Sequence, residues 1–229
     1  MLHKTLEAII CCAHCGQKNR VFEQGAPGSH KCRKCGMVLF VPFKYIVFDC
    51  ETTGLPSGRS NPHLVQLAWS VHGPDGTTLA ERNYIVKPSG YSIPEASTRV
   101  HGITDQRARK DGVPLPHVIE SFLLAADTEG VRLVAHNIDF DTRVIGAEIK
   151  LVGFKSKFND RPRYCTMRST VDICSIPRRS GGYKWPSLQE LHLHLFGQHF
   201  QGGHNAMQDV QATARCFFEL RRRGFITQV

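Results

Sequence analysis

Apolar runs of strand length and apolar residues at helical spacing alternate along the chain from residue 43 onward. Three runs rich in β-branched and aromatic residues come first, and the turn-forming sequence Gly73-Pro74-Asp75-Gly76 separates the second run from the third. Two further runs of this kind follow later in the chain. The pattern predicts five strands, at residues 45–50, 64–72, 79–86, 131–135 and 170–173.

Segments with apolar side chains three and four residues apart lie between and after these runs. Ser187 and Glu190 match the capping-box pattern at the start of one such segment, and Gly197 ends it. A meander of strands followed by alternating strands and helices predicts an α/β fold, a mixed sheet flanked by helices. The predicted helices cover residues 95–102, 116–126, 138–151, 187–197 and 205–223.

The first 41 residues are predicted to form a separate small unit, a zinc ribbon ahead of a main domain over residues 42–229. Two Cys-x-x-Cys-Gly sequences at a spacing typical of four-cysteine zinc sites indicate this, and glycine permits the turn after each pair. A redox-active pair would need only one Cys-x-x-Cys. One structural Zn²⁺ would supply the folding energy of this short segment. The predicted ligands are Cys12, Cys15, Cys32 and Cys35.

The role of the ribbon is left open by the sequence. Cys11 adjoins the first ligand, but only Cys12 gives the two-residue gap to Cys15, so Cys11 is interpreted as a bystander. A folding staple or protein-docking surface and a nucleic-acid contact are about equally well supported. Basic residues at positions 31, 33 and 34 favour nucleic-acid contact slightly.

Two carboxylates, Asp49 and Glu51, come directly after the first predicted strand of the main domain. Side chains alternate between the faces of a strand, so these two project together while Cys50 points to the opposite face. An unpaired carboxylate pair at the end of a central strand would be costly without a cation. We therefore interpret this pair as metal ligands.

A second acidic motif, His136-Asn137-Ile138-Asp139-Phe140-Asp141, begins the helix predicted at 138–151. Asp139 and Asp141 lie about 200° apart on a helix, so only one of them can face the site. Asn137 and Asp141 are four residues apart and share a helix face, which favours Asp141. Asp139, in the first turn, is interpreted as a structural complement to the helix dipole.

The third motif holds His204 and Asp209 at the start of the last predicted helix. Asp209 lies beside the apolar face of that helix, where it can reach an ion held against the sheet. Histidine exchanges protons near neutral pH, so His204 at the helix entry is suited to take a proton from water. Four carboxylates and a histidine can together support two-metal hydrolysis of a phosphodiester.

Charge and cysteine content fit an enzyme of this kind. The net charge is +9 although a metal site would use four of only 20 acidic residues, so the remaining surface favours a polyanionic partner. No apolar stretch approaches the roughly 18 residues of a membrane span, and Lys4 and Glu7 argue against a signal peptide. We expect a cytoplasmic protein with reduced thiols and no membrane partner.

Taken together, Asp49-x-Glu51, Asn137-x-x-Phe140-Asp141 and His204-x4-Asp209 resemble the DEDDh 3′→5′ exonucleases. This family includes the epsilon subunits of bacterial DNA polymerase III, RNase T and oligoribonuclease. The resemblance covers roughly residues 43–224 and fills all five family positions. The segment Val100-His101-Gly102-Ile103-Thr104 also resembles the epsilon-like branch.

The resemblance implies a ribonuclease H-like fold, two Mg²⁺ or Mn²⁺ ions, and release of nucleoside 5′-monophosphates from 3′ ends. Asp49, Glu51 and Asp209 would bind the ion that activates water, with Asp49 also holding the second ion and Asp141 acting directly or through water. The residues implied at the terminal nucleotide are Thr52, Thr53, Gly54, Leu55, His101, Asn137 and Phe140.

We predict hydrolysis of single-stranded DNA in preference to RNA, because the motif likeness is to epsilon-type enzymes. An RNA-directed exoribonuclease, an inert nucleic-acid-binding adapter and a ribonuclease H endonuclease are the alternatives, and any polymerase or repair partner is left open. Tyr183 and Trp185 are candidates for base stacking or for core packing. Basic candidates for guiding the strand are Arg161, Arg163, Arg178, Arg179 and Lys184.

Overall fold

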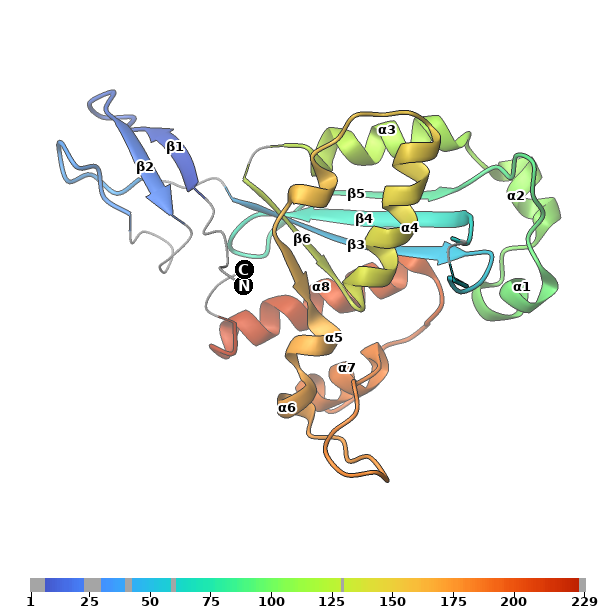
Figure 1. The fold of residues 1–229 in the computed structure, drawn as a ribbon. Coiled ribbons are helices and arrows are strands. Elements are labelled where there is room, and N and C mark those ends of the chain that lie inside the picture. Colours follow the sequence, from blue (N-terminus) through green and yellow to red (C-terminus); the bar gives the residue numbers. More distant parts are fainter. Residues whose placement is uncertain (1–6, 23–29, 40–42, 59–60, 129, 227–229) are drawn as a thin grey trace.

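The computed structural model describes residues 7–22, 30–39, 43–58, 61–128 and 130–226. The predicted domain boundary between residues 41 and 42 lies outside these ranges. Strands β1 (Glu7–Cys11) and β2 (Lys18–Phe22) form a separate antiparallel pair within the N-terminal segment (Figure 1). Both strands were missed by the sequence pattern.

A five-stranded mixed sheet forms the centre of the larger part. Its strand order is β5-β4-β3-β6-β7, with β5-β4-β3 antiparallel and β3-β6-β7 parallel. The predicted meander of three strands is therefore confirmed. The strands are β3 (Lys44–Thr52), β4 (Leu64–His72), β5 (Thr78–Ile85), β6 (Val131–Ala135) and β7 (Arg163–Cys165).

Helices cover both faces of this sheet (Figure 1). On one face, α3 and α4 pack against the strands, and α8 crosses the other face with α7 beside it. No helix in the described ranges is long and apolar enough to cross a membrane. The helices are α1 (Glu95–His101), α2 (Asp105–Asp111), α3 (Leu115–Ala126), α4 (Ile138–Leu151), the 3₁₀ turn Phe158–Asp160, α5 (Thr166–Ser169), α6 (Val171–Cys174), α7 (Leu188–Phe196) and α8 (Ala206–Arg222).

The two faces of β3 explain how the sheet is held. Ile46 and Phe48 pack on the α3 and α4 side, whereas Tyr45 and Val47 pack against α8. Full burial of a side chain of this size contributes about 1.5–3 kcal/mol. Even-numbered and odd-numbered residues of β3 therefore face different layers, and this alternation continues into the residues that follow.

One predicted strand is wrong. Residues 170–173 lie across the end of α5 and in α6, and the last strand of the sheet, β7, comes earlier in the chain. The Thr170 hydroxyl donates to the Thr166 carbonyl at 2.7 Å, an i to i−4 contact that belongs to helical backbone. The place beside β6 in the sheet is taken by β7. Val171 and Ile173 therefore lie in α6, with Thr170 at its N-cap, in spite of their β-propensity.

Candidate active site

Three carboxylates meet where β3 ends beside α8. Asp49 and Glu51 continue the odd-numbered face of β3, so both side chains point toward that helix. Asp209 lies in the first turn of α8. Each side chain offers one carboxylate oxygen, and these oxygens all lie within 4.8 Å of one another. The fold thus brings together acidic residues that are 160 positions apart in the sequence.

Burial and mutual repulsion raise the pKa of these groups. The pKa of Asp49 lies well above its ordinary value, mainly through burial and then through the charges of Asp141, Asp209 and Glu51. Burial, with the charges of Asp209 and Asp141, raises the pKa of Glu51 from 4.5 to about 7. A raised pKa means that the folded protein binds the Glu51 proton more tightly than the unfolded chain does. The contribution of Glu51 to the free energy of unfolding is therefore fully present below pH 4.5 and is lost as the pH rises through about 7. Above that pH a divalent cation would offset the repulsion, and carboxylate oxygens suit Mg²⁺ or Mn²⁺.

Asp141 reaches the site from the opposite face of the sheet. It is only 2% exposed, and its Oδ1 accepts a hydrogen bond from the Cys50 backbone amide at 3.0 Å. Burial raises the pKa of Asp141 to about 7, against the lowering effect of the Cys50 thiol and amide. It lies outside the set of three converging oxygens but close enough to raise the pKa of Asp49. Asp139 instead forms an ion pair with Arg168, which fits its predicted structural role.

His204 stands at the entrance of α8. Its backbone is left-handed, with φ of 58°, and its side chain is exposed. Burial raises the pKa of Asp209, while the backbone amides of His204 and Asn205 and the His204 side chain oppose that rise. His204 therefore lies beside the carboxylate cluster, as expected for a residue that takes a proton there.

Gln66 of β4 holds this entrance in place and was missed from the sequence. Its Oε1 accepts from the Ala206 backbone amide at 3.3 Å, and its Nε2 donates to Asn83 Oδ1 at 2.8 Å. The Asn205 side chain caps α8 by accepting from the Gln208 amide. A glutamine within the apolar run Leu64–Trp69 was the available signal, because a buried polar side chain in a central strand needs partners.

The residues expected at the terminal nucleotide flank the edge of the sheet where Asp49, Glu51 and Asp209 converge. Thr52 is buried, whereas Leu55 is 82% exposed, although it is apolar. A Cβ added at Gly54 would meet no protein atom within 4 Å, which leaves room for a ligand. Thr53 exchanges two hydrogen bonds, both of 2.9 Å, with the backbone of His63.

His101, Asn137 and Phe140 take different positions around this edge. His101 is buried: burial lowers its pKa, the Thr52 backbone opposes this, and His204 adds to the lowering. Asn137 is exposed and begins α4 with a left-handed backbone. Phe140 packs partly against the core on the α4 side. His101 therefore lies between the loop that follows β3 and the entrance of α8.

The sequence match to known proteins extends across this whole site. A family model described as an exonuclease, RNase_T, matches residues 46–217. The chain belongs to this exonuclease family. The matched range contains all five predicted catalytic positions, from Asp49 to Asp209.

Two similar proteins are much longer than this exonuclease. The DNA polymerase III PolC-type of Lactococcus lactis subsp. lactis is 32% identical over 190 residues, which are 79% of this chain and 10% of the relative. The DNA polymerase III subunit epsilon-like protein of Rhodobacter capsulatus is 34% identical over 192 residues, 80% of this chain and 25% of the relative. The chain thus spans a quarter or less of the length of either relative.

The fold is shared with solved exonuclease structures. Exonuclease I of E. coli, in a complex with a dA16 oligonucleotide, gives a TM-score of 0.67 at 18% identity. The likeness covers 79% of this chain and 41% of that one. The predicted ribonuclease H-like fold, a mixed sheet flanked by helices, is confirmed.

Several basic residues between the second and third motifs have structural roles in the exonuclease. Arg161 donates from Nε to the Ala126 carbonyl at 3.1 Å, and Arg163 donates to the Asn159 carbonyl at 2.9 Å. Lys184 pairs with Glu190. These contacts attach Arg161 and Arg163 to the neighbouring backbone. Arg178 and Arg179, together with Tyr183 and Trp185, are exposed.

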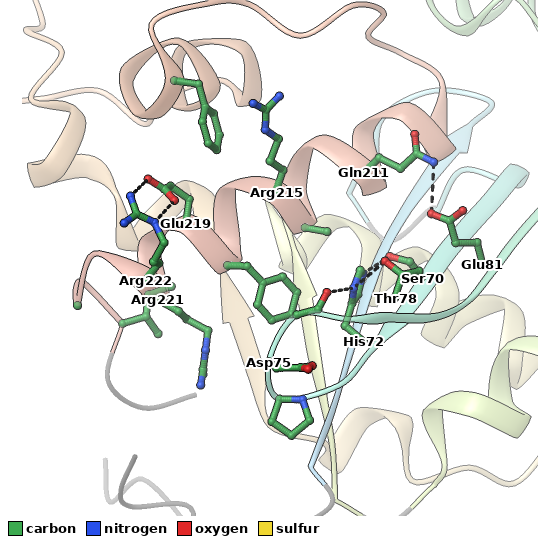
Figure 2. Close-up of a pocket in the computed structure, with 17 residues that line it drawn as sticks. Ser70, His72, Asp75, Thr78, Glu81, Gln211, Arg215, Glu219, Arg221 and Arg222 are labelled. Carbon is green, nitrogen blue, oxygen red and sulfur yellow. Dashed lines mark hydrogen bonds and ion pairs between the residues drawn. The ribbon is translucent and has the colours of Figure 1, made fainter. Parts of the chain in front are cut away.

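A cavity of about 1150 Å³ lies toward the other end of α8 (Figure 2). His72 lines this cavity and pairs in register with Tyr45, at the start of β3. Asp49 lies further along the same strand, so the cavity is separate from the carboxylate cluster. Glu219 on its wall is paired with Arg222, and Gln211 with Glu81. Among the described residues, the converging carboxylates lie at Asp49, Glu51 and Asp209 and not in the lining of this cavity.

Four cysteine sulfurs of the N-terminal unit also converge. Cys12 Sγ lies 3.5 Å from Cys35 Sγ, Cys15 Sγ lies 3.6 Å from Cys32 Sγ, and all four lie within 4.8 Å of one another. Gly16 and Gly36 have φ of 70° and 72°, as the predicted turns require. Cys11 is exposed and outside this group.

The cysteines of this group have shifted pKa values. Burial raises the pKa of Cys32, but the backbone of Cys35 and Lys34 and the side chain of Asn19 lower it to about 6 overall. Asn19 Nδ2 donates to Cys32 Sγ at 3.5 Å. In the same group the Met37 backbone lowers the pKa of Cys35, but burial and the other three thiols raise it to about 12 overall. Four cysteine sulfurs that converge in this way are the donor set of a structural zinc site.

We expect the purified protein to carry about one zinc ion per chain, bound by these four cysteines. A Cys32→Ser/Cys35→Ser variant should lose that zinc, whereas Cys11→Ser should retain it, because Cys11 lies outside the group. Metal analysis by plasma mass spectrometry measures both. Full zinc occupancy in the double variant would exclude this site.

Proposed function

We propose that this exonuclease hydrolyses phosphodiester bonds at the 3′ ends of single-stranded DNA and releases nucleoside 5′-monophosphates. The convergence of Asp49, Glu51 and Asp209 beside His204 is the observation that carries the proposal. Membership of the exonuclease family over residues 46–217 supports the reaction class.

Two Mg²⁺ or Mn²⁺ ions fit the donor set of this edge. Asp49, Glu51 and Asp209 would hold the first, and Asp49 would be shared with the second. Asp141 would contribute directly or through water, because it is buried near this edge and its charge raises the pKa of Asp49. When bound, the ions supply activation of water and neutralisation of charge on the phosphate and the leaving oxygen.

His204 is the proposed general base. It accepts a proton at an imidazole nitrogen from the attacking water, and its exposed position lets it return that proton to solvent. The Gln66 contact to the Ala206 amide fixes the turn that presents His204. Gln66 is therefore a positioning residue in this scheme.

The loop after β3 is proposed to receive the terminal nucleotide. Thr52, Thr53, Gly54 and Leu55 would border it, with the exposed Leu55 side chain against the base. His101, Asn137 and Phe140 would complete the surrounding wall, as the family resemblance implies.

Single-stranded DNA is proposed as the substrate on three supports. The exonuclease I neighbour was crystallised with a dA16 oligonucleotide, and one relative is described as epsilon-like. The net charge of +9 favours a polyanion. The inert-adapter alternative conflicts with the retention of all five catalytic positions, whereas RNA is the alternative that an experiment must separate.

Product analysis on matched strands tests this proposal. We expect single-stranded DNA to be degraded faster than RNA of the same sequence, and a blunt duplex slowest, because a stacked end resists threading into the site. Chromatography should show nucleoside 5′-monophosphates as products. Faster degradation of RNA would reassign the substrate, and nucleoside 3′-monophosphates as products would contradict the proposed bond cleavage.

A further inference from the structure

A hairpin over residues 176–185 projects from the larger part between α6 and α7 (Figure 1). We infer that this hairpin, the basic arm, binds the single strand upstream of the 3′-terminal nucleotide. The inference rests on the proposed function and adds to it a second binding surface. This surface lies outside the catalytic edge, by which we mean the edge of the sheet that carries Asp49, Glu51 and Asp209.

The basic arm has a regular backbone. The Lys184 amide donates to the Ile176 carbonyl and the Arg178 amide donates to the Gly182 carbonyl, both at 2.9 Å. Gly181 and Gly182 at its tip have φ of 89° and 71°, conformations that favour glycine. The arm is thus a formed hairpin with a hydrogen-bonded backbone.

Its side chains have the composition of a single-strand-binding surface. Tyr183 and Trp185 are 45% and 57% exposed, so the core-packing alternative for them is wrong. Arg178 and Arg179 are exposed, and no ion pair holds either of them in the described part of the chain. The stretch from Ser175 to Pro186 contains no acidic residue. Exposed rings stack on bases and guanidinium groups pair with phosphates, so single-stranded nucleic acid matches both features.

Contacts at the base of the arm attach it to the catalytic edge. His136 Nε2, at the end of β6, donates to the Pro186 carbonyl at 3.0 Å, and the next residue, Asn137, begins α4. Gln189, one turn further on, donates from Nε2 to the Phe200 and Gly202 carbonyls at 3.1 and 2.9 Å. Gly202 lies two residues before His204.

The base of the arm is therefore joined both to the helix that carries Asp141 and to the loop that carries His204. Lys184 pairs with Glu190 at 2.5 Å and fixes the same base to α7. A strand whose 3′ end occupies the catalytic edge has to leave in its 5′ direction, and the arm, attached to that edge at its base, exposes rings and cations to solvent.

The first test separates the arm from the catalytic edge by substrate length. The p-nitrophenyl ester of thymidine 5′-phosphate occupies only the terminal position, whereas a 20-nucleotide oligo(dT) also reaches the arm. We expect a Tyr183→Ala/Trp185→Ala variant to raise KM for the oligonucleotide by about 10- to 100-fold, in line with the loss of base stacking. Hydrolysis of the ester should stay within about twofold of the unmodified enzyme, because the arm does not reach its single nucleotide.

A binding test does not depend on turnover. Fluorescence anisotropy of 5′-labelled oligo(dT), without added Mg²⁺, gives the dissociation constant over a range of salt concentrations. An Arg178→Ala/Arg179→Ala variant should reduce the salt slope by about 1.4, since each of the two lost phosphate contacts on a single strand removes about 0.7. Lys155→Ala/Lys157→Ala removes two exposed cations beyond the C-terminal end of α4 and should leave the slope unchanged.

The outcomes distinguish the two proposals. If the ester is not hydrolysed by the unmodified protein, the proposed function fails, and the anisotropy measurement still decides the role of the arm. If the ester is hydrolysed but neither arm variant changes oligonucleotide KM or affinity, the arm inference is overturned while the function stands. Equal loss of affinity in the lysine control would also overturn it, because the effect would then be one of net charge.

Discussion

Asp209→Ala is expected to reduce hydrolysis of single-stranded DNA to background, even at saturating Mg²⁺. The variant removes one of three converging oxygen donors, so the cation held by Asp49 and Glu51 loses a ligand. Initial rates on a 5′-labelled strand measure the loss. Asp111→Ala is the matched control, because Asp111 is an exposed aspartate at the end of α2.

Stability separates loss of a ligand from loss of the fold in this variant. The charge of Asp209 contributes to raising the pKa of Glu51 to about 7, so its removal should relieve repulsion above that pH. The metal-free Asp209→Ala protein should therefore have a Tm at pH 8 at least equal to that of the unmodified protein. A near-normal rate, or a Tm well below the unmodified value, would contradict the role assigned to Asp209.

His204→Ala is expected to lower kcat by about 10²- to 10⁴-fold, the contribution typical of a general base. Metal binding should be retained, because the three carboxylate oxygens converge without His204. The Mg²⁺-dependent rise in Tm measures this retention. His194→Ala, which changes an exposed histidine on α7, should leave kcat unchanged.

The opposite results have distinct meanings for His204. A kcat within a few fold of normal would show that another group takes the proton. Loss of the Mg²⁺-dependent stabilisation would instead make His204 a metal ligand rather than a base. Either result would contradict the role of general base that we assign to the exposed His204 at the entrance of α8.

The catalytic edge was predictable where it followed strong local patterns. Successive side chains of a strand point to opposite faces, which is enough to place Asp49 and Glu51 on one face of β3 and Cys50 on the other. The structure shows both faces of this strand packed against helices. The capping residues Ser187 and Glu190 form the predicted reciprocal pair of hydrogen bonds.

Features that depend on distant partners were not predictable. The helical conformation around Thr170 follows from the pairing of β7 with β6, which local propensity does not encode. Gln66 acquires its role from Ala206, 140 residues later in the chain. The exposure of Tyr183 and Trp185 depends on where the basic arm leaves the fold, so the sequence alone could not separate stacking from core packing.

Degradation of a 3′-phosphorylated strand, compared with strands that are free, blocked at the 5′ end, or closed into a circle, tests the proposed 3′→5′ activity most directly. The convergence of Asp49, Glu51 and Asp209 beside His204 predicts that the free and 5′-blocked strands are shortened from the 3′ end at equal rates. The 3′-phosphorylated strand and the circle should resist. Cleavage of the circle as fast as the linear strand would contradict the assignment and favour an endonuclease.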